Sequence, residues 1–397
     1  MKNKKTSTAV KLLAAFLLLS ILLSVSAFSA PSNSGKESET ETKYPDLGLT
    51  CKSAVLMEAS TGKILYAKNA DEALPPASVT KVMTLLLIME EIDSGRLNYT
   101  DTVTASAKAA SMGGSQIYLK EGESMTVEDL LKSVVIASAN DAAVALAEHI
   151  AGSEEAFVDR MNKRAEELGM TATNFENTNG LDDTTENHVT SARDIAIMSR
   201  ELIKHRKIFD YSSIWMDTIR NGTFGLTNTN RLVRFYKGAT GLKTGSTSKA
   251  KFCISATACR DGMDLICVIM AADTRDVRNE EAKKLLDWGF ANYELFTAPA
   301  ESLGNIKVMG GTESTVGAER ADFSCVVSKG EASKIEKLTE LPEAIPAPVE
   351  KGSVIGKTTF KIGDRVIGES DVVSTADVQK IGFWELFGRI LKGFFIK

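Results

Sequence analysis

Residues 75–84 read Pro-Pro-Ala-Ser-Val-Thr-Lys-Val-Met-Thr. The two prolines block a helix before Ser78, and the apolar run behind it predicts a helix over 79–91. Ser78 and Lys81 are three residues apart and therefore share one face of that helix. A hydroxyl beside an amine is typical of a nucleophile with its base. Taken alone, Ser78 would be interpreted as a helix N-cap, so the assignment depends on other motifs.

Two further motifs follow in order. Ser138-Ala139-Asn140 lies sixty residues beyond Ser78, and Lys243-Thr244-Gly245 lies one hundred and five residues beyond Ser138. Each motif is weak alone, but together they predict a serine acyl-transfer site whose base is a lysine. A second Ser-x-x-Lys occurs at Ser246 and Lys249. It lies in a Gly-Ser-Thr-Ser run that predicts a turn, so Ser246 is a poor candidate nucleophile.

The order of the elements predicts an α/β domain. Strands are expected at both ends of residues 53–290, and helices between them, so that one sheet joins the two ends. The expected strands are 53–56, 64–67, 252–258 and 264–270, the last two joined near Asp261-Gly262, and the expected helices are 79–91, 127–151, 154–168 and 279–292. Beyond Pro299, short alternating runs such as 358–362 and 365–369 predict a second, β-rich domain.

These motifs resemble those of the low-molecular-weight penicillin-binding proteins, the serine D-Ala-D-Ala carboxypeptidases. The similarity extends to VLMEASTG at 55–62, to NGL at 179–181 with His188, and to LLDWGF at 285–290. It covers the chain from about Leu49 to the C-terminus. The resemblance implies the penicillin-binding, β-lactamase-like fold, with an α/β transpeptidase domain, a small all-β domain in a supporting role and a C-terminal amphipathic helix.

The first thirty residues have the composition of a secretory signal peptide. Lysines at 2, 4 and 5 precede an apolar stretch over 10–23 and small residues over 24–30. Cleavage after Ala27 or after Ser29 fits the small-residue rule, and an uncleaved membrane anchor is the alternative. We therefore expect a signal peptide at 1–29, a disordered spacer at 30–44, the catalytic domain at 45–298 and the β-rich domain at 299–375.

The last twenty residues, 378–397, predict an amphipathic helix. Apolar residues, many of them aromatic, recur at intervals of three and four, and charged residues fill the gaps. The interleaved charges make a membrane span costly, so we expect this helix to lie in the membrane surface. The alternative is a helix docked on the body of the protein. With an export signal, an anchor of this kind places the site on the outer face of the cytoplasmic membrane, on the cell-wall side.

The residues of the three motifs suggest distinct roles. Ser78 is the candidate nucleophile, and Lys81 can take its proton only if the amine is neutral. Burial and a second cation, supplied by Lys243, would lower the pKa of Lys81. Ser138 could relay a proton during deacylation, while Asn140 would hold Lys81 and the substrate amide.

The candidate substrate-binding residues lie near the third motif. Lys243, Thr244 and Gly245 suit an edge strand that pairs with a peptide and attracts its carboxylate. By resemblance, the backbone amides of Ser78 and Ser246 would form an oxyanion hole, and Arg278 would bind the terminal carboxylate of D-alanine. The alternative for Arg278 is a solvated charge at the start of a helix. His188 is interpreted as structural, because no Asp-His-Ser order accompanies it.

Composition excludes several other classes of protein. The net charge of −5 provides no basic surface for nucleic acid. The five cysteines include no C-x-x-C pair, and the three histidines are widely spaced, so we expect neither a metal nor a cofactor. Cys253, Cys259 and Cys267 alternate with apolar residues in strand-like runs, so buried thiols are their simplest interpretation.

We therefore expect hydrolysis of the terminal D-Ala-D-Ala bond of peptidoglycan stem peptides, and acylation by β-lactam antibiotics. Three alternatives remain: an endopeptidase of wall cross-links, a β-lactamase, and a penicillin-binding scaffold without activity. The sequence contains no Glu-x-x-Leu-Asn segment between the second and third motifs that would supply the deacylating base of a β-lactamase. Ala139, where the related motif has Asp, also argues against a β-lactamase-type loop.

Overall fold

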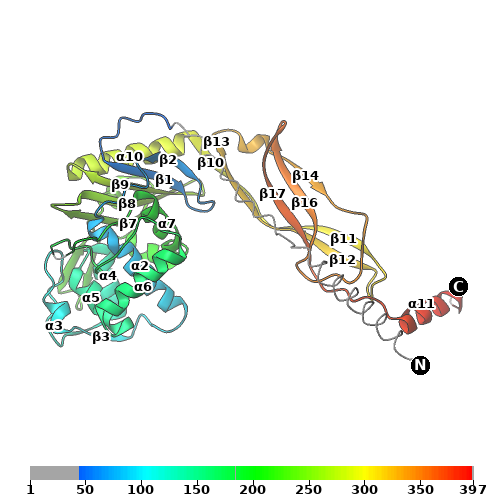
Figure 1. Cartoon of the computed structure of the whole chain (residues 1–397), viewed down its shortest axis with the longest axis horizontal. Coiled ribbons are helices and arrows are strands. Elements are labelled where there is room, and N and C mark those ends of the chain that lie inside the picture. The colour runs from blue at the N-terminus through cyan, green and yellow to red at the C-terminus, as the bar shows by residue number, and fades with distance from the viewer. Residues whose placement is uncertain (1–43, 184, 396–397) are drawn as a thin grey trace, which may run out of the picture. The chain divides into compact units, whose positions relative to one another are not determined.

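A five-stranded antiparallel sheet forms the centre of the N-terminal part of the protein (Figure 1). The computed structural model describes residues 44–183 and 185–395, so the expected signal peptide and nearly all of the expected spacer lie outside the described residues. The strand order is β2-β1-β9-β8-β7. The strands are β1 (Ser53–Glu58), β2 (Ile64–Lys68), β7 (Ala239–Thr247), β8 (Lys251–Arg260) and β9 (Met263–Ala272). The prediction that one sheet joins the two ends of this segment is confirmed.

Helices cover both faces of this sheet, which explains why its central strands are mostly apolar and largely buried. Helix α10 (Arg275–Asn292) packs on one face of β9 and β8, and α7 (Ala192–Leu202) contacts β9 and β1 from the other side (Figure 1). Every residue of β1 is buried as a result. A strand buried on both faces has no reason to alternate apolar with polar residues.

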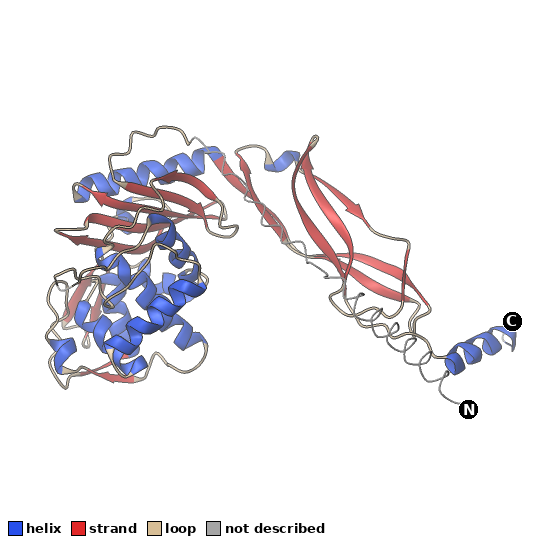
Figure 2. Cartoon of the chain, viewed as in Figure 1, coloured by secondary structure: helices blue, strands red, loops and turns tan. Residues whose placement is uncertain are grey.

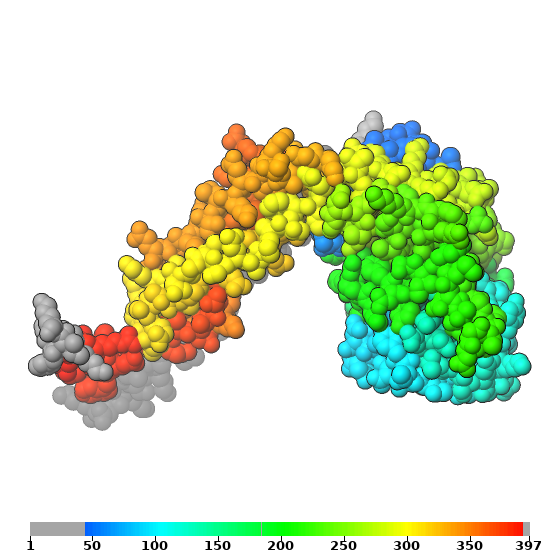
Figure 3. All heavy atoms as spheres, turned by 180° about the vertical axis from the view of Figure 1, so that it is seen from behind, coloured from blue at the N-terminus to red at the C-terminus, as the bar shows by residue number. Residues whose placement is uncertain are grey.

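The remaining helices form a layer that carries the first two motifs. In the space-filling view this layer, cyan to green, is continuous with the sheet (Figure 3). Its elements are η1 (Ala77–Thr80), α2 (Lys81–Asp93), α3 (Ala107–Ala110), α4 (Val127–Ile136), α5 (Asn140–Ala151), α6 (Glu154–Glu167), η2 (Arg206–Ile208), α8 (Phe209–Ser212) and α9 (Leu232–Phe235), with the strand pairs β3 (Thr102–Thr104) and β4 (Ser124–Thr126), and β5 (Met216–Ile219) and β6 (Phe224–Thr227).

Two helix predictions were wrong in ways that concern the site. The single helix expected over 127–151 is two helices, because Ser138 adopts a left-handed φ of 63° that ends the hydrogen-bond ladder between α4 and α5. The helix expected from Asn279 begins at Arg275, where the Thr274 hydroxyl caps the N–H of Val277 at 3.1 Å. The first turn of this helix is mostly charged and lacks the apolar periodicity by which a helix is predicted from sequence.

The C-terminal part consists mainly of strands (Figure 2). Strand β10 pairs with β13, and a second sheet has the order β14-β16-β17-β12-β11-β15. The expected hairpin at Gly363-Asp364 is present as β16 and β17, with Ile362 opposite Arg365. The elements are β10 (Tyr293–Ala298), β11 (Glu301–Met309), β12 (Thr315–Arg320), β13 (Phe323–Ser328), η3 (Ala332–Lys334), β14 (Glu336–Glu340), β15 (Ala344–Pro346), β16 (Val354–Ile362) and β17 (Arg365–Ser374).

The C-terminal helix is shorter than the sequence predicted. Helix α11 spans Phe383–Phe395, whereas Val378 forms a β-bridge with Val349 and is buried in a small valine cluster of the β domain. The start expected at Val378 was therefore wrong, because this valine belongs to the core of the β domain and not to the helix. Within the described residues, no helix combines the length and apolar character that a bilayer crossing requires.

Candidate active site

The first motif lies where the chain enters α2. Ala77 takes a left-handed φ of 49°, and the short helix η1 then carries Ser78 directly before Lys81, the first residue of α2. The amine Nζ of Lys81 lies 3.0 Å from Oγ of Ser78. Lys81 is fully buried. One turn of backbone thus holds the Ser78 hydroxyl, the candidate nucleophile, within hydrogen-bond reach of a buried amine.

Three oxygen atoms surround the amine of Lys81. Besides Ser78, they are Oδ1 of Asn140 at 2.6 Å and the backbone carbonyl of Asn179 at 2.9 Å. A neutral amine has two N–H groups and one lone pair. Because Asn140 Oδ1 and the Asn179 carbonyl can only accept, they take both N–H groups and direct the lone pair at the Ser78 hydroxyl. In this state Lys81 can accept the proton of Ser78.

The contribution of Asn179 was missed by the sequence analysis, which used this residue only as part of a resemblance. The contact is made by a backbone carbonyl, a group that every residue has. Its side chain is not involved, so residue type gives no signal for it. The neighbouring Gly180 offers an indirect signal, since a positive φ and close packing both require glycine there.

The second motif occupies the break between α4 and α5. Asn140 is oriented at three points: its backbone N–H donates to the Ser115 carbonyl at 2.7 Å, its Nδ2 to the Gly113 carbonyl at 2.7 Å, and its Oδ1 accepts from Lys81. The buried carboxylate of Asp141 accepts backbone N–H groups from the loop that follows Ser115. This arrangement fixes which end of the Asn140 amide faces Lys81.

The third motif lies on the edge strand β7, as predicted. Nζ of Lys243 donates to Oγ of Ser138 at 2.8 Å and to the Thr244 carbonyl at 2.8 Å. A Cβ on Gly245 would stand 2.8 Å from the backbone nitrogen of Ser78, so only glycine lets the strand approach the nucleophile this closely. Ser246, expected in a turn, is a residue of β7, because the strand continues to Thr247.

Burial and charge lower the pKa values of both lysines. Desolvation holds the pKa of Lys81 well below its ordinary value, and the charge of Lys243 lowers it further, while Asp141 opposes the shift. Burial and then the charge of Arg278 lower the pKa of Lys243 to about 7. The environment therefore favours the neutral amine that a general base needs.

A cleft of about 590 Å³ opens over these groups. Its lining includes Ser78, Ser138 and residues 244–246, together with three arginines, Arg231, Arg275 and Arg278. Within the described part of the chain, no ion pair joins any of the three to a carboxylate. The cleft is therefore suited to an anionic ligand.

Arg278 is largely buried beside this cleft. Its guanidinium donates to Oδ1 of Asn279, at 3.1 and 2.9 Å, and more weakly to the Cys253 carbonyl at 3.5 Å. Burial, followed by the charge of Arg275, lowers the pKa of Arg278 to about 10, which leaves it a cation at neutral pH. Asn279 therefore holds Arg278 in place without neutralising its charge.

His188 lies behind the nucleophile and does not contact it. Its Nδ1 accepts the N–H of Glu176 at 2.9 Å, so the neutral ring carries its proton on Nε2, which lies 2.8 Å from the hydroxyl of Thr80. Thr80 in turn donates to the Ala77 carbonyl at 2.9 Å. Burial lowers the pKa of His188 to about 4. The histidine thus supports the backbone that carries Ser78.

Neither metal ligands nor disulfides were found among the residues that the structure describes. No group of three or more His, Cys, Asp or Glu side chains is placed to hold a metal ion there. All five cysteines are free thiols. Cys253 and Cys267 are buried as expected and Cys51 is buried as well, whereas Cys259, which was expected to be buried, is partly exposed because it lies near the end of β8.

Both parts of the chain are similar to known proteins. Residues 38–274 match the family model described as D-alanyl-D-alanine carboxypeptidase, and residues 290–380 match that of the penicillin-binding protein 5 C-terminal domain. The D-alanyl-D-alanine carboxypeptidase DacF of Bacillus subtilis is 43% identical over 377 residues, which cover 92% of this chain and 95% of the relative.

Solved structures show the same similarity. Penicillin-binding protein 5 of Haemophilus influenzae superposes with a TM-score of 0.74 at 34% identity, covering 84% of this chain and 98% of that one. Penicillin-binding protein D2 of Listeria monocytogenes, in its ampicillin-bound form, has a TM-score of 0.57 at 31% identity, covering 62% of this chain and all of the other. The similarity to the first therefore includes most of the C-terminal part as well.

Proposed function

Because the chain belongs to the D-alanyl-D-alanine carboxypeptidase family, and is thus a serine-type peptidase, we propose that it cleaves the terminal D-Ala-D-Ala bond of peptidoglycan stem peptides through an acyl-enzyme on Ser78. One observation carries this mechanism. The buried amine of Lys81 is held by two oxygens that only accept hydrogen bonds, and its remaining position faces Ser78 Oγ at 3.0 Å. The confirmed fold class, an α/β penicillin-binding domain followed by a β domain, supports it.

Acylation begins with the attack of Ser78 Oγ on the carbonyl carbon of the penultimate D-alanine. The hydroxyl proton passes to Nζ of Lys81 as the C–O bond forms. The backbone N–H groups of Ser78 and Ser246 stabilise the oxyanion of the tetrahedral intermediate. The C–N bond then breaks, and the leaving nitrogen receives a proton from Lys81 through the Ser138 hydroxyl, which Lys243 orients.

Deacylation reuses the same groups. A water molecule gives its proton to the neutral amine of Lys81, and its oxygen attacks the ester carbonyl. Collapse of the second tetrahedral intermediate returns the proton to Ser78 Oγ. Asn140 keeps Lys81 oriented through both half-reactions and also binds the substrate amide.

The cationic wall of the cleft selects for a free carboxylate. In this proposal Arg278 binds the terminal carboxylate, Lys243 adds a second positive charge, and Thr244 and Gly245 line the edge strand along which the peptide lies. The main-chain carboxylate next to the terminal peptide bond exists only on the last residue of a peptide. This preference favours a carboxypeptidase over an endopeptidase that would cut internal cross-links.

β-Lactams would acylate Ser78 by the same route. The ring amide occupies the place of the scissile bond, but its nitrogen stays attached to the acyl group and cannot diffuse away. The ampicillin-bound form of the Listeria monocytogenes protein supports this extension. A β-lactamase would release the adduct rapidly, whereas a penicillin-binding scaffold would keep the adduct and release no D-alanine from a peptide.

We also propose a location for this activity and the domain limits that go with it. The protein would be exported by residues 1–29 and would act on the outer face of the cytoplasmic membrane, with a catalytic domain at 45–298 and a β domain at 299–375. Helix α11 would lie on the membrane surface, since Phe383 and Trp384 leave 70% and 78% of their surface exposed.

Intact-mass analysis tests the proposal directly. The purified protein and Ser78→Ala are incubated with penicillin and, separately, with diacetyl-Lys-D-Ala-D-Ala. A long-lived adduct and released D-alanine in the wild type only would establish the carboxypeptidase. Rapid loss of the adduct would favour a β-lactamase, an adduct without D-alanine release would favour an endopeptidase or scaffold, and no adduct would overturn the site.

A further inference from the structure

The loop that presents the Asn179 carbonyl to Lys81 is fixed by its own hydrogen bonds. Oδ1 of Asn177 accepts the backbone N–H groups of Asn179 at 3.2 Å and Gly180 at 2.7 Å, and Oδ1 of Asn179 accepts that of Leu181 at 2.9 Å. Gly180 packs so closely that a Cβ there would stand 1.9 Å from the Ala77 carbonyl. The loop is thus rigid within itself and rests against the backbone before the nucleophile.

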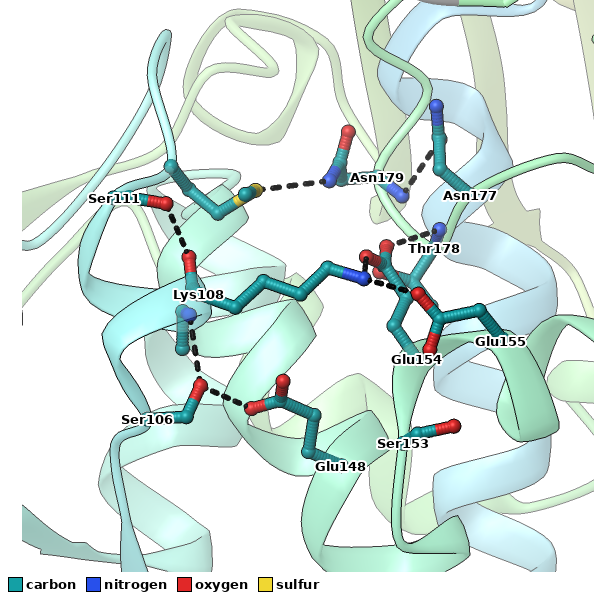
Figure 4. Close-up of polar contacts among 12 residues, drawn as sticks. Ser106, Lys108, Ser111, Glu148, Ser153, Glu154, Glu155, Asn177, Thr178 and Asn179 are labelled. Atoms are coloured by element: carbon teal, nitrogen blue, oxygen red, sulfur yellow. Dashed lines mark hydrogen bonds and ion pairs between the residues drawn. The ribbon is translucent and has the colours of Figure 1, made fainter.

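A carboxylate outside the three motifs ties this loop to the helical layer. Glu154, the first residue of α6, is 7% exposed, and its Oε1 accepts from the backbone N–H of Thr178 at 3.1 Å and from the Thr178 hydroxyl at 2.8 Å. Its Oε2 lies 2.9 Å from Nζ of Lys108. Figure 4 shows Glu154 between Lys108 and Thr178, with Asn179 beside them.

We propose that Glu154 is a positioning residue for the general base: by holding Thr178, it fixes the next carbonyl along the chain, that of Asn179, against Lys81. The inference rests on the proposed function, because it assigns Glu154 a role in the same acylation step. Thr178 is also held from the other side, since its own carbonyl accepts the Thr84 hydroxyl at 2.6 Å. Glu154 of α6 and Thr84 of α2 therefore both form hydrogen bonds with Thr178.

Loss of the Glu154 carboxylate has a defined consequence for Lys81. The N–H and hydroxyl of Thr178 would lose their shared acceptor, and the Asn179 carbonyl would be held less firmly against Lys81, by the hydrogen bonds of the loop and by Thr84 alone. The amine would keep only Asn140 as a firm acceptor, so its lone pair would spend less time directed at Ser78. A general base whose lone pair is misdirected for part of the time should slow the acylation of Ser78 by roughly 10- to 100-fold.

The same change alters the titration of Lys81. A carbonyl acceptor stabilises the ammonium form more than the amine, so its loss lowers the pKa of Lys81. The other charged groups around this amine, Lys243 on β7 and Asp141 on α5, stay in place, as does Arg278 behind Lys243. The acidic limb of the acylation rate, where Lys81 becomes protonated, should therefore move to lower pH.

The adjacent residue Glu155 provides the matched control for Glu154. Glu155 also binds Lys108, at 2.7 Å, but its side chain is 75% exposed and makes no hydrogen bond to Thr178. Glu155→Ala removes one charge from the same lysine without touching the loop. Glu154→Gln keeps an oxygen for Thr178 and loses only the ion pair with Lys108, so it should retain most of the acylation rate.

The experiment measures the rate at which penicillin acylates the full-length chain, by intact mass, across pH 5 to 9. We expect Glu154→Ala to acylate about 10- to 100-fold more slowly than wild type, to reach full occupancy at long times and to show the shifted acidic limb, while Glu155→Ala behaves as wild type. Full occupancy separates a slow site from a misfolded fraction. If Glu154→Ala does not fold, Thr178→Val, which removes one of the two hydrogen bonds, takes its place.

Two outcomes would overturn the inference, and a third would overturn its premise. Glu154→Ala or Thr178→Val with wild-type rates and an unmoved acidic limb would refute the positioning role. An equal loss of acylation rate in Glu155→Ala would also refute it, because the effect would then come from Lys108 or from the loss of any nearby negative charge. A wild-type chain that forms no adduct would instead refute the proposed function itself.

Discussion

Replacing Lys243 by Met should make the protein more stable at neutral pH while reducing acylation. The ordinary pKa of a lysine, 10.5, falls to about 7 at this buried position. Each pKa unit corresponds to about 1.4 kcal/mol, so the buried charge costs about 5 kcal/mol at low pH and about 4 kcal/mol at pH 7. Methionine keeps the apolar stem and removes this cost. It also leaves Ser138 Oγ and the Thr244 carbonyl without their shared donor, which costs about 1–3 kcal/mol.

The net expectation for Lys243→Met is a stabilisation of about 1–3 kcal/mol at pH 7. For a domain of this size that corresponds to a rise of roughly 2 to 4 °C in Tm for each kcal/mol. Most substitutions of buried residues destabilise a protein, whereas this one should stabilise it. Acylation by penicillin should fall by about 100-fold or more, because Ser138 loses its orienting contact and Lys81 its neighbouring cation.

The pH dependence provides the refuting result. Between pH 7 and 10.5 the unfolded chain still holds the Lys243 proton that the native state has released, so the stability of the wild type rises with pH across this range. The advantage of Lys243→Met should therefore shrink from pH 7 to pH 9.5 in scanning calorimetry. Lys120→Met, at an exposed position, is the control and should show no such trend. A Tm for Lys243→Met below that of wild type at pH 7 would contradict the argument.

Four further expectations follow from other parts of the structure. Gly180→Ala should lower the free energy of unfolding, measured in urea, by about 3 kcal/mol or more, because its Cβ would collide with a backbone carbonyl. Gly262→Ala, where a Cβ meets open space, should lower it by about 1 kcal/mol. Equal losses in the two variants would contradict the close packing of Gly180. Protonation of the buried His188 ring should lower the free energy of unfolding of the wild type by about 3 kcal/mol between pH 6.5 and pH 4. In His188→Gln the free energy of unfolding should fall less over this range. An unchanged fall would mean that other groups cause it. Arg278→Leu should abolish the preference for a peptide with a free carboxylate over its C-terminal amide, as measured by D-alanine release against amide release, and a retained preference would remove Arg278 from that role. Deletion of 383–397 should prevent sedimentation with anionic vesicles, and continued binding would refute anchoring by α11.

The sequence predicted the sheet and most helices because their signals are local. The apolar strands at 252–258 and 264–270 and the hairpin at Gly363-Asp364 needed only composition and a turn. The three motifs could be placed in order, and the structure brings Ser78, Lys81 and Asn140 into one hydrogen-bonded group.

What could not be predicted depends on backbone geometry or on distant contacts. The left-handed φ of Ser138 divides a stretch whose composition is helical throughout, because tertiary contacts override local propensity there. Val378 has the same apolar character whether it begins a helix or completes a β-domain core, and only its partner Val349 decides. The Asn179 carbonyl and its link to Glu154 involve a group that carries no residue-specific signal.

Under the proposed function, the closeness of β7 to Ser78 would limit how this protein could escape a β-lactam antibiotic. Gly245 lies against the Ser78 backbone. In the proposed mechanism the amine of Lys81, 3.0 Å from Ser78 Oγ, would serve any acyl donor that reaches the serine, whether a peptide or a β-lactam. A substitution in this buried floor would slow both reactions together and sacrifice the enzyme along with its sensitivity. We therefore expect selection under β-lactams to favour changes at the exposed rim of the cleft, at residues such as Phe235, where the two ligands differ in shape.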